Sequence, residues 1–161
     1  GNTLFTAARY GNVIGSNASI FELLLRLKQE NKPFLITDAR CTRFWLTMED
    51  AIDLIILAAQ QEYPGVTIVP KAPASYVLDL FHAVDPDHEI IDIGIRPGEK
   101  LHELLIDRVE SRHTIDWGSY FVVYPPQSNM KSNLPDGYEY SSDNPARWLS
   151  IEELREMADL A

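Results

Sequence analysis

"GIRPGEKLHE", residues 94–103, links two apolar runs, and how it folds decides how the chain is organised. The run that leads into it, "IIDIGI" at 90–95, is typical of a strand. Pro97 suits the first turn of a helix, so the sequence predicts a helix over residues 97–106. Pro97 and the glycine after it also predict a tight turn that projects Arg96 from the carboxyl end of a strand. Open α/β folds bind their ligands at that edge.

Strands and helices are predicted to alternate outward from this stretch. Thr47 with Asp50 and Ser150 with Glu153 have the spacing of capping boxes, which predicts where two helices begin. Residues 127–144 are polar and predict a long surface loop. The alternation predicts an α/β fold. The predicted strands are 3–10, 34–39, 66–72, 90–95 and 119–126, and the predicted helices are 19–32, 48–61, 75–84, 97–106 and 151–161.

Composition restricts the possible partners. The 161 residues are 45% hydrophobic and include 14 Lys and Arg against 24 Asp and Glu, a net charge of −10. Such a chain repels nucleic acid and anionic membranes, so a few local cations must hold any phosphate that it binds. Cys41 is the only cysteine, which excludes an internal disulfide and fits a reducing cytoplasmic setting. No apolar run is long enough to span a membrane.

Two stretches besides 94–103 contain candidate binding residues. In "RYGNVIGS", residues 9–16, the glycines would let the Asn12 amide approach a ligand, although an ordinary strand-to-helix connection explains the loop as well. It lacks the spacing of a dinucleotide-binding fingerprint. Arg40 and Arg43 come shortly before the aromatic pair Phe44-Trp45. Each arginine suits either a phosphate contact or a surface position where its stem covers apolar side chains.

Other chemistries find little support in the sequence. His82 and His88 lie around a polar turn whose spacing matches no calcium loop. His102 and Glu103 lack the second histidine of a zinc protease helix. Cys41 has no evident base nearby in the sequence. We therefore expect no metal site and no nucleophilic catalysis.

Five motifs in one order resemble a known family. The motifs are spread from residue 9 to residue 157, the match spans nearly all of the chain, and it is similar to the carboxyl-terminal half of the UDP-N-acetylglucosamine 4,6-dehydratases. These enzymes form the polysaccharide biosynthesis branch of the extended short-chain dehydrogenase/reductases. The motifs are "RYGNVIGS" (9–16), "ITDARCTRFWLTMEDAIDLI" (36–55), "IVPKAPA" (68–74), "IGIRPGEKLHELLI" (93–106) and "YEYSSDNPARWLSIEELREM" (138–157).

The resemblance implies a fold and a domain organisation. The chain would be the α/β substrate-binding portion of an extended short-chain dehydrogenase/reductase, without most of the Rossmann sheet. It would form a single unit, 1–161, with a late Rossmann-type strand and loop at 1–15. A substrate-binding α/β region would follow at 16–125, then a polar loop and terminal helix at 126–161.

The resemblance also implies a reaction and a set of contacts. The complete enzyme would use NADP to remove water across C5 and C6 of a UDP-N-acetylhexosamine, giving a 4-keto-6-deoxy sugar nucleotide for surface polysaccharide or glycan synthesis. Thr37 and Arg43 would line the nucleotide end, Arg96 would engage the diphosphate, and Glu99 would face the uridine. The implied substrate contacts are Asn12, Asn17, Ala18, Ser19, Ile20, Thr37, Arg43, Arg96 and Glu99, with Val13 beside the cofactor.

Two departures from the family pattern shape the expectation. Asn17-Ala18 replaces the usual Arg-Gly, which removes a cation beside the ligand. The glycine-rich cofactor turn, the Tyr-x-x-x-Lys pair and the acid/base residues belong to the family's amino-terminal half, and Ile14 stands where Tyr10 would need its lysine. The resemblance thus implies no catalytic residue here and no dehydration by this chain alone.

The missing half leaves several organisations open. A Rossmann half, in a longer chain or as a separate partner, would complete the active site and cover the edge of the strand at 3–10. A homo-oligomer is also expected. The alternatives are a non-catalytic interaction or assembly module derived from this family, and another sugar-nucleotide epimerase or reductase of the superfamily.

Overall fold

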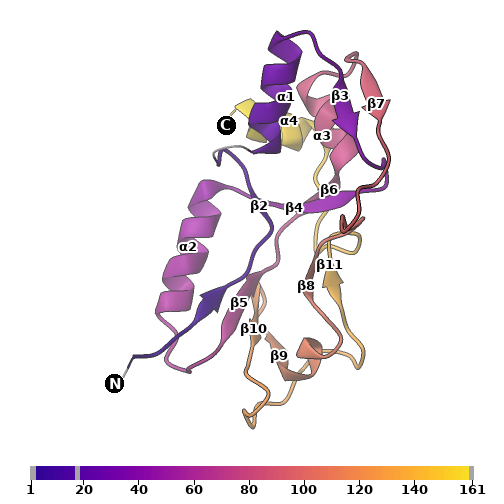
Figure 1. The fold of residues 1–161 in the computed structure, drawn as a ribbon. Helices are drawn as coiled ribbons and strands as arrows, with labels where there is room; N and C mark the ends of the chain where they lie inside the picture. The colour runs from indigo at the N-terminus through magenta and orange to yellow at the C-terminus, as the bar shows by residue number, and fades with distance from the viewer. Residues whose placement is uncertain (1–2, 17–18, 160–161) are drawn as a thin grey trace.

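The computed structural model describes residues 3–16 and 19–159, and it shows two groups of elements stacked end to end (Figure 1). The helices are α1 (Ile20–Gln29), α2 (Met48–Ala59), α3 (Val77–Val84) and α4 (Ile151–Asp159), with a 3-10 turn, η1 (Glu110–His113). The strands are β1 (Ala7–Ala8), β2 (Asn12–Val13), β3 (Phe34–Ile36), β4 (Thr42–Leu46), β5 (Thr67–Pro70), β6 (Ala74–Tyr76), β7 (Ile90–Asp92), β8 (Leu104–Ile106), β9 (Thr114–Asp116), β10 (Tyr120–Val123) and β11 (Tyr140–Ser141).

Four small sheets connect these elements. The largest has the order β1-β5-β10-β9, with β1 parallel to β5 and the other two pairs antiparallel. A second sheet, β2-β4-β6, crosses between the two groups, with β2 parallel and β6 antiparallel to β4. β3 pairs with β7 in parallel, and β11 pairs with β8 antiparallel. Mixed sheets and helices confirm the predicted α/β class.

The core is divided in the same way as the elements. In the upper group, α1, α3 and α4 pack around Phe21, Phe34 and Leu80, all three fully buried. In the lower group, Phe44 and Tyr140 pack against each other with ring centroids 4.9 Å apart. Trp45, 1% exposed, belongs to the upper cluster although it follows Phe44 directly, because successive side chains of a strand point to opposite faces. β4 therefore joins the two groups.

The predicted helix starts are confirmed where capping residues mark them. Thr47 Oγ1 accepts from the backbone N–H of Asp50, and the Asp50 carboxylate accepts from the backbone N–H of Thr47. The reciprocal bonds between Ser150 and Glu153 open α4 in the same way. Ser19 is the N-cap of α1.

The helix predicted over 97–106 is wrong. Pro97 and Gly98 instead form the centre of a turn closed by a bond from Glu99 N–H to the Arg96 carbonyl (3.0 Å). The φ of +83° at Gly98 suits the third position of a type II turn and stops a helix there. The apolar residues that follow pair with β11 as strand β8. The spacing of Leu101, Leu104 and Leu105 imitates a helical face, and this similarity misled the prediction.

The strand predicted at 3–10 is partly as expected. Its described core, β1, pairs on one side with β5 of this chain, so it is not isolated from the sheet. Its other edge pairs with no strand among the described residues. Leu4 and Phe5, just before it, are 53% and 76% exposed.

Candidate functional site

A pocket of about 230 Å³ lies where α1, β3 and β4 meet the 93–103 segment. Trp45, Phe81 and Cys41 contribute to its apolar wall, with Leu23 and Leu35. Six residues predicted from the sequence line this one pocket, although they are spread over more than 80 positions of the chain: Asn12, Ile20, Thr37, Arg43, Arg96 and Glu99. The fold thus brings together most of the implied substrate contacts.

The turn at 96–99 places Glu99 against β3 and β4. Glu99 Oε1 accepts from Thr37 Oγ1 (2.7 Å), and Oε2 accepts from the Arg96 backbone N–H (3.1 Å). Its Oε1 also lies 3.8 Å from Arg43 Nη2. The bond from Thr37, then that from the Arg96 backbone, holds the pKa of Glu99 below its usual value. Glu99 is therefore ionised at neutral pH and fixes the turn to the pocket wall.

The two arginines of the pocket are held differently. Arg43 is largely buried, and its Nη1 donates to the carbonyls of Thr42 (2.7 Å) and Leu101 (3.0 Å). Arg96 is exposed on the turn, and its backbone rather than its side chain makes the bond to Glu99. Arg43 is a cation held in the wall, and Arg96 is an exposed cation on the turn beside it.

Glu103 is a residue of this region that the sequence analysis missed as a site residue. Its Oε2 accepts from Phe44 N–H (2.8 Å) and its Oε1 from Asn12 Nδ2 (3.1 Å). Burial raises the pKa of Glu103 above its usual value, against the bond from Phe44, the nearby Arg43 charge and the bond from Asn12. Glu99 and Glu103 fall on one side of the segment in a helix as well as in a strand, so their spacing does not single out Glu103.

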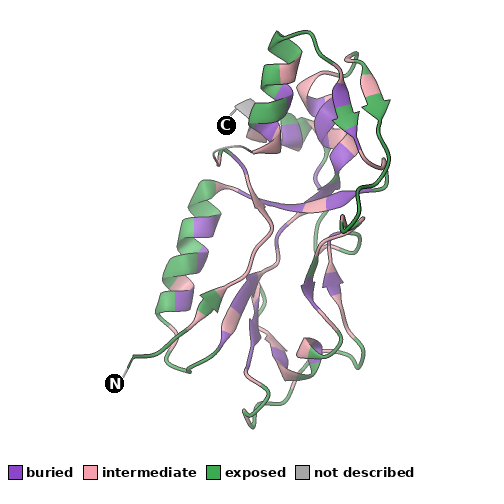
Figure 2. Ribbon diagram, in the orientation of Figure 1, coloured by how far each residue is buried: buried purple, intermediate pink, exposed green. Residues whose placement is uncertain are grey.

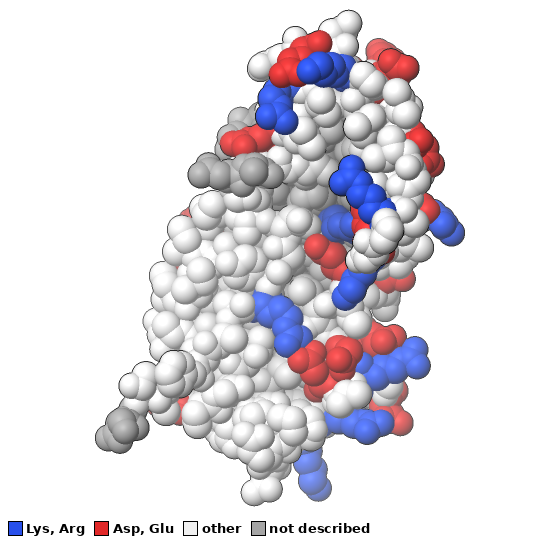
Figure 3. Space-filling view, in the orientation of Figure 1, with Lys and Arg blue, Asp and Glu red and all other residues white. Residues whose placement is uncertain are grey.

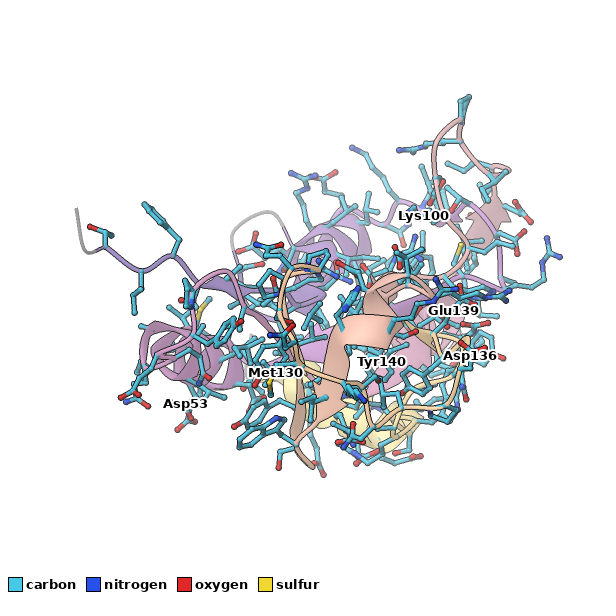
Figure 4. All side chains as sticks on the ribbon, turned by 90° about the horizontal axis from the view of Figure 1, so that it is seen from below. Asp53, Lys100, Met130, Asp136, Glu139 and Tyr140 are labelled. Atoms are coloured by element: carbon cyan, nitrogen blue, oxygen red, sulfur yellow. The ribbon has the colours of Figure 1, made fainter. Side chains whose placement is uncertain are left out.

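The carboxyl-terminal segment holds Glu103 in place. Ser142, fully buried, donates its N–H to the Glu103 carbonyl (2.9 Å), and its Oγ accepts from Glu103 N–H (2.8 Å). Ser142 Oγ also lies 2.7 Å from Thr42 Oγ1 on β4. Tyr140, labelled in Figure 4, donates to the Ala72 carbonyl (3.0 Å). The segment after residue 126 is thus part of the structure behind the site.

Val13 and Ser19 are not among the described residues that line the pocket. Val13 lies in β2 opposite Leu46. Ser19 is occupied as the N-cap of α1, where its hydroxyl accepts from Glu22 N–H (3.3 Å). Asn17 and Ala18 lie outside the described residues.

Charge is unevenly distributed over the visible face of the molecule. Lys, Arg, Asp and Glu side chains gather at the top and along the right of Figure 3, whereas the surface over α2 on the left is almost free of them. Within residues 3–16 and 19–159, no cluster of three His, Cys, Asp or Glu residues is suited to hold a metal ion. None of the described helices is both long and apolar enough to cross a membrane.

Comparison with known proteins identifies the family. The model of the polysaccharide biosynthesis protein family matches residues 1–125. The chain belongs to this family. The resemblance drawn from the sequence motifs is thereby confirmed.

Two of the relatives are named as enzymes that act on sugar nucleotides. The chain is 35% identical to a UDP-N-acetylglucosamine 4,6-dehydratase (inverting) of Campylobacter jejuni, over 94% of this chain and 50% of the relative. It is 31% identical to a UDP-glucose 4-epimerase of Rickettsia bellii, over 96% of this chain and 49% of the relative. The crystal structure of Pen from Bacillus thuringiensis matches with a TM-score of 0.83 and 30% identity, over 98% of this chain and 49% of that one. The chain spans about half the length of the relatives that it matches.

Proposed function

We propose that this chain is the UDP-sugar-binding portion of a UDP-N-acetylglucosamine 4,6-dehydratase that acts in the cytoplasm in surface polysaccharide or glycan synthesis. One observation carries the proposal: Asn12, Thr37, Arg43, Arg96 and Glu99, chosen from sequence motifs, line a single pocket. Membership of the polysaccharide biosynthesis protein family supports the assignment.

The pocket has the composition that a nucleotide diphosphate requires. The chain carries a net charge of −10, so the two arginines beside one cavity are a local exception to an acidic protein. Arg43 offers a fixed charge and Arg96 an exposed guanidinium, which together suit a diphosphate. The apolar wall formed by Leu23, Leu35 and Phe81 suits the flat face of a base.

The complete reaction needs groups that another part supplies. In the proposed enzyme, NADP provides the hydride chemistry, and an amino-terminal half provides the cofactor turn, the acid and the base. The residues of this chain bind and orient the sugar nucleotide, with Val13 toward the cofactor. We therefore expect the 161 residues alone to bind substrate and not to form the 4-keto-6-deoxy product.

The exposed face of α2 is where we place that cofactor-binding half. Met48, Ile52, Ile55 and Ile56 are each about half exposed on this helix, whose outward side is green in Figure 2. Asp53 projects from the same helix in Figure 4. The helix packs against β1, whose outer edge is unpaired among the described strands. A contiguous apolar face and a free strand edge are features of a surface that another body covers.

Light scattering distinguishes the possible occupants of this face. If a second copy covers it, the wild-type chain is a dimer, and the double variant Ile52→Glu/Ile56→Glu is a monomer. If the cofactor-binding half is the occupant, the wild-type chain is a monomer that binds an apolar dye, and the double variant binds less of it.

Calorimetry of uridine diphosphate binding tests the proposed function. We expect Arg96→Ala to weaken binding by roughly 1.5–3 kcal/mol, the contribution of hydrogen bonds to a charged group. Arg108→Ala is the matched control, because Arg108 is 70% exposed and pairs with Glu139 away from the pocket residues. Equal affinities for wild type and Arg96→Ala would remove the role of Arg96. A tight homo-oligomer with no UDP-dependent thermal shift would favour an interaction or assembly module instead.

A further inference from the structure

The Asn12 side chain has a fixed orientation at the edge of the pocket. Its Nδ2 donates to the Phe44 carbonyl (3.3 Å) and to Glu103 Oε1 (3.1 Å). Both partners are acceptors, so the amide nitrogen and not the amide oxygen must face them. With both N–H groups engaged, Oδ1 is the atom that Asn12 offers to the pocket it lines.

Glu103 is held tightly enough to impose this orientation. Its backbone is bonded on both sides to the buried Ser142, and its second carboxylate oxygen accepts from Phe44 N–H. Glycine at residue 11 leaves room for the carboxylate beside the Asn12 segment. A Cβ at Gly11 would lie 2.6 Å from Phe44 Cβ and 3.0 Å from Glu103 Oε2. The position of the carboxylate is therefore fixed by three segments of the chain.

The carboxylate at this position must be an acceptor at both oxygens. Its two side-chain partners, Phe44 N–H and Asn12 Nδ2, are both donors. A glutamine would place its own NH₂ against one of them, and a protonated carboxyl would place its O–H there. Arg43 on β4 is the charged group that acts on Glu103, while Gly11, Asn12, Phe44 and Ser142 present uncharged groups. His102, the preceding residue, turns its ring to Thr42 Oγ1 (2.8 Å).

We propose that Glu103 is a positioning residue that fixes Asn12 with its carbonyl oxygen toward the pocket, so that the bound ligand must present a hydrogen-bond donor there. This inference rests on the proposed function and sets the direction of the ligand in the site. A deprotonated diphosphate has only acceptors and would be repelled by Oδ1 and by the carboxylate behind it. The diphosphate therefore lies at the Arg43 and Arg96 end, and the hydroxyl or amide N–H groups of the sugar lie at Asn12.

Nuclear magnetic resonance of the ligand-free chain tests the positioning directly. The side-chain NH₂ signals of Asn12 are expected to shift with pH along the titration of Glu103, at a pKa above that of an ordinary glutamate. In Glu103→Gln this titration is expected to vanish, and in Glu62→Gln, an exposed control, it persists. The proposal would be overturned if the chemical shifts of the Asn12 NH₂ group changed neither with pH nor in Glu103→Gln.

Calorimetry with two ligands tests the consequence for binding. Uridine diphosphate lacks the sugar, and UDP-N-acetylglucosamine carries it. Glu103→Gln is expected to lower the affinity for the sugar nucleotide about tenfold, the effect of one lost hydrogen bond, and to change that for uridine diphosphate by less than about threefold. An equal loss for both ligands would contradict the direction proposed.

A second variant covers the case in which Glu103→Gln does not fold. Asn12→Ala leaves the carboxylate its bond from Phe44 and is expected to show the same loss confined to the sugar nucleotide. An unchanged preference for the sugar nucleotide in Asn12→Ala would refute the contact. If the wild-type chain binds neither ligand, the proposed function fails, and the resonance titration alone decides whether Glu103 positions Asn12.

Discussion

Glu99 and Glu103 are four residues apart in one segment, yet their surroundings shift the pKa of the two carboxyl groups in opposite directions. Glu99 lies at the pocket wall near solvent, where bonds from Thr37 and the Arg96 backbone lower its pKa. Glu103 lies behind Asn12, where burial raises its pKa despite the bonds it accepts. At Glu103 the effect of desolvation on the pKa exceeds that of the hydrogen bonds, and at Glu99 the hydrogen bonds have the larger effect. The Glu99 end suits contact with a charged ligand, and the Glu103 end suits the fixing of a neighbouring side chain.

The largest expected effect comes from filling the space beside Glu103. Gly11→Ala should destabilise the fold by about 2–3 kcal/mol, because overpacking a site with rigid neighbours costs this much. The added Cβ meets Phe44 Cβ, which is fixed to a central strand, and the Glu103 carboxylate. Urea unfolding followed by circular dichroism measures the change.

The matched control for this variant lies at the other end of the segment. Gly98 has a φ of +83°, and a Cβ added there would meet none of the described atoms within 4 Å, so Gly98→Ala adds backbone strain without a clash. It should cost about 1 kcal/mol, as expected for an alanine in the left-handed region. If Gly11→Ala destabilised the chain no more than Gly98→Ala, the Glu103 end would be less tightly packed than we describe.

A pH titration of stability should separate Glu103 from the rest of the molecule. Its folded pKa is raised, so its contribution to stability is complete below the ordinary glutamate pKa of about 4.3 and is lost as the pH rises through the folded value. Between pH 4 and pH 8, wild type should therefore lose stability relative to Glu103→Gln. Each unit of pKa shift corresponds to about 1.4 kcal/mol. Parallel stability curves for the two proteins would contradict a raised pKa.

The sequence predicted the elements whose signals are local. Capping boxes at Thr47 and Ser150 located the starts of α2 and α4, because the side chain that caps a helix is adjacent to it in the chain. The segment after Gly98 was misread, because whether Leu104 and Leu105 form a helix or a strand depends on pairing with β11, more than 30 residues away. Intrinsic patterns cannot decide such a case without the partner strand.

The sequence predicted several residues of the pocket but not the buried residue behind it. Motifs named Thr37, Arg43 and Glu99, and the structure brings them into one pocket. Glu103 was not found, because its importance depends on burial behind Asn12 and on the absence of a side chain at Gly11, which no short motif expresses. The pocket supports the proposed roles of its predicted residues without testing them, and the roles of all the predicted site residues, Val13, Asn17 and Ala18 included, stay predictions.

The smallest expected effect is at Glu99, and it should have the opposite sign to that at Glu103. The folded pKa of Glu99 is lowered, so its contribution to stability is present above the ordinary glutamate pKa and is lost as the pH falls through the folded value. Glu99→Gln should keep the bond from Thr37 and flatten the acid side of the stability curve between pH 5 and pH 3. The difference is small because solvent screens a group at the rim of the pocket. Urea midpoints of wild type and Glu99→Gln across this range measure it. A steeper acid loss in Glu99→Gln than in wild type would mean that the Thr37 bond does not favour the ionised carboxylate, and the contrast between the two ends of the segment would fail.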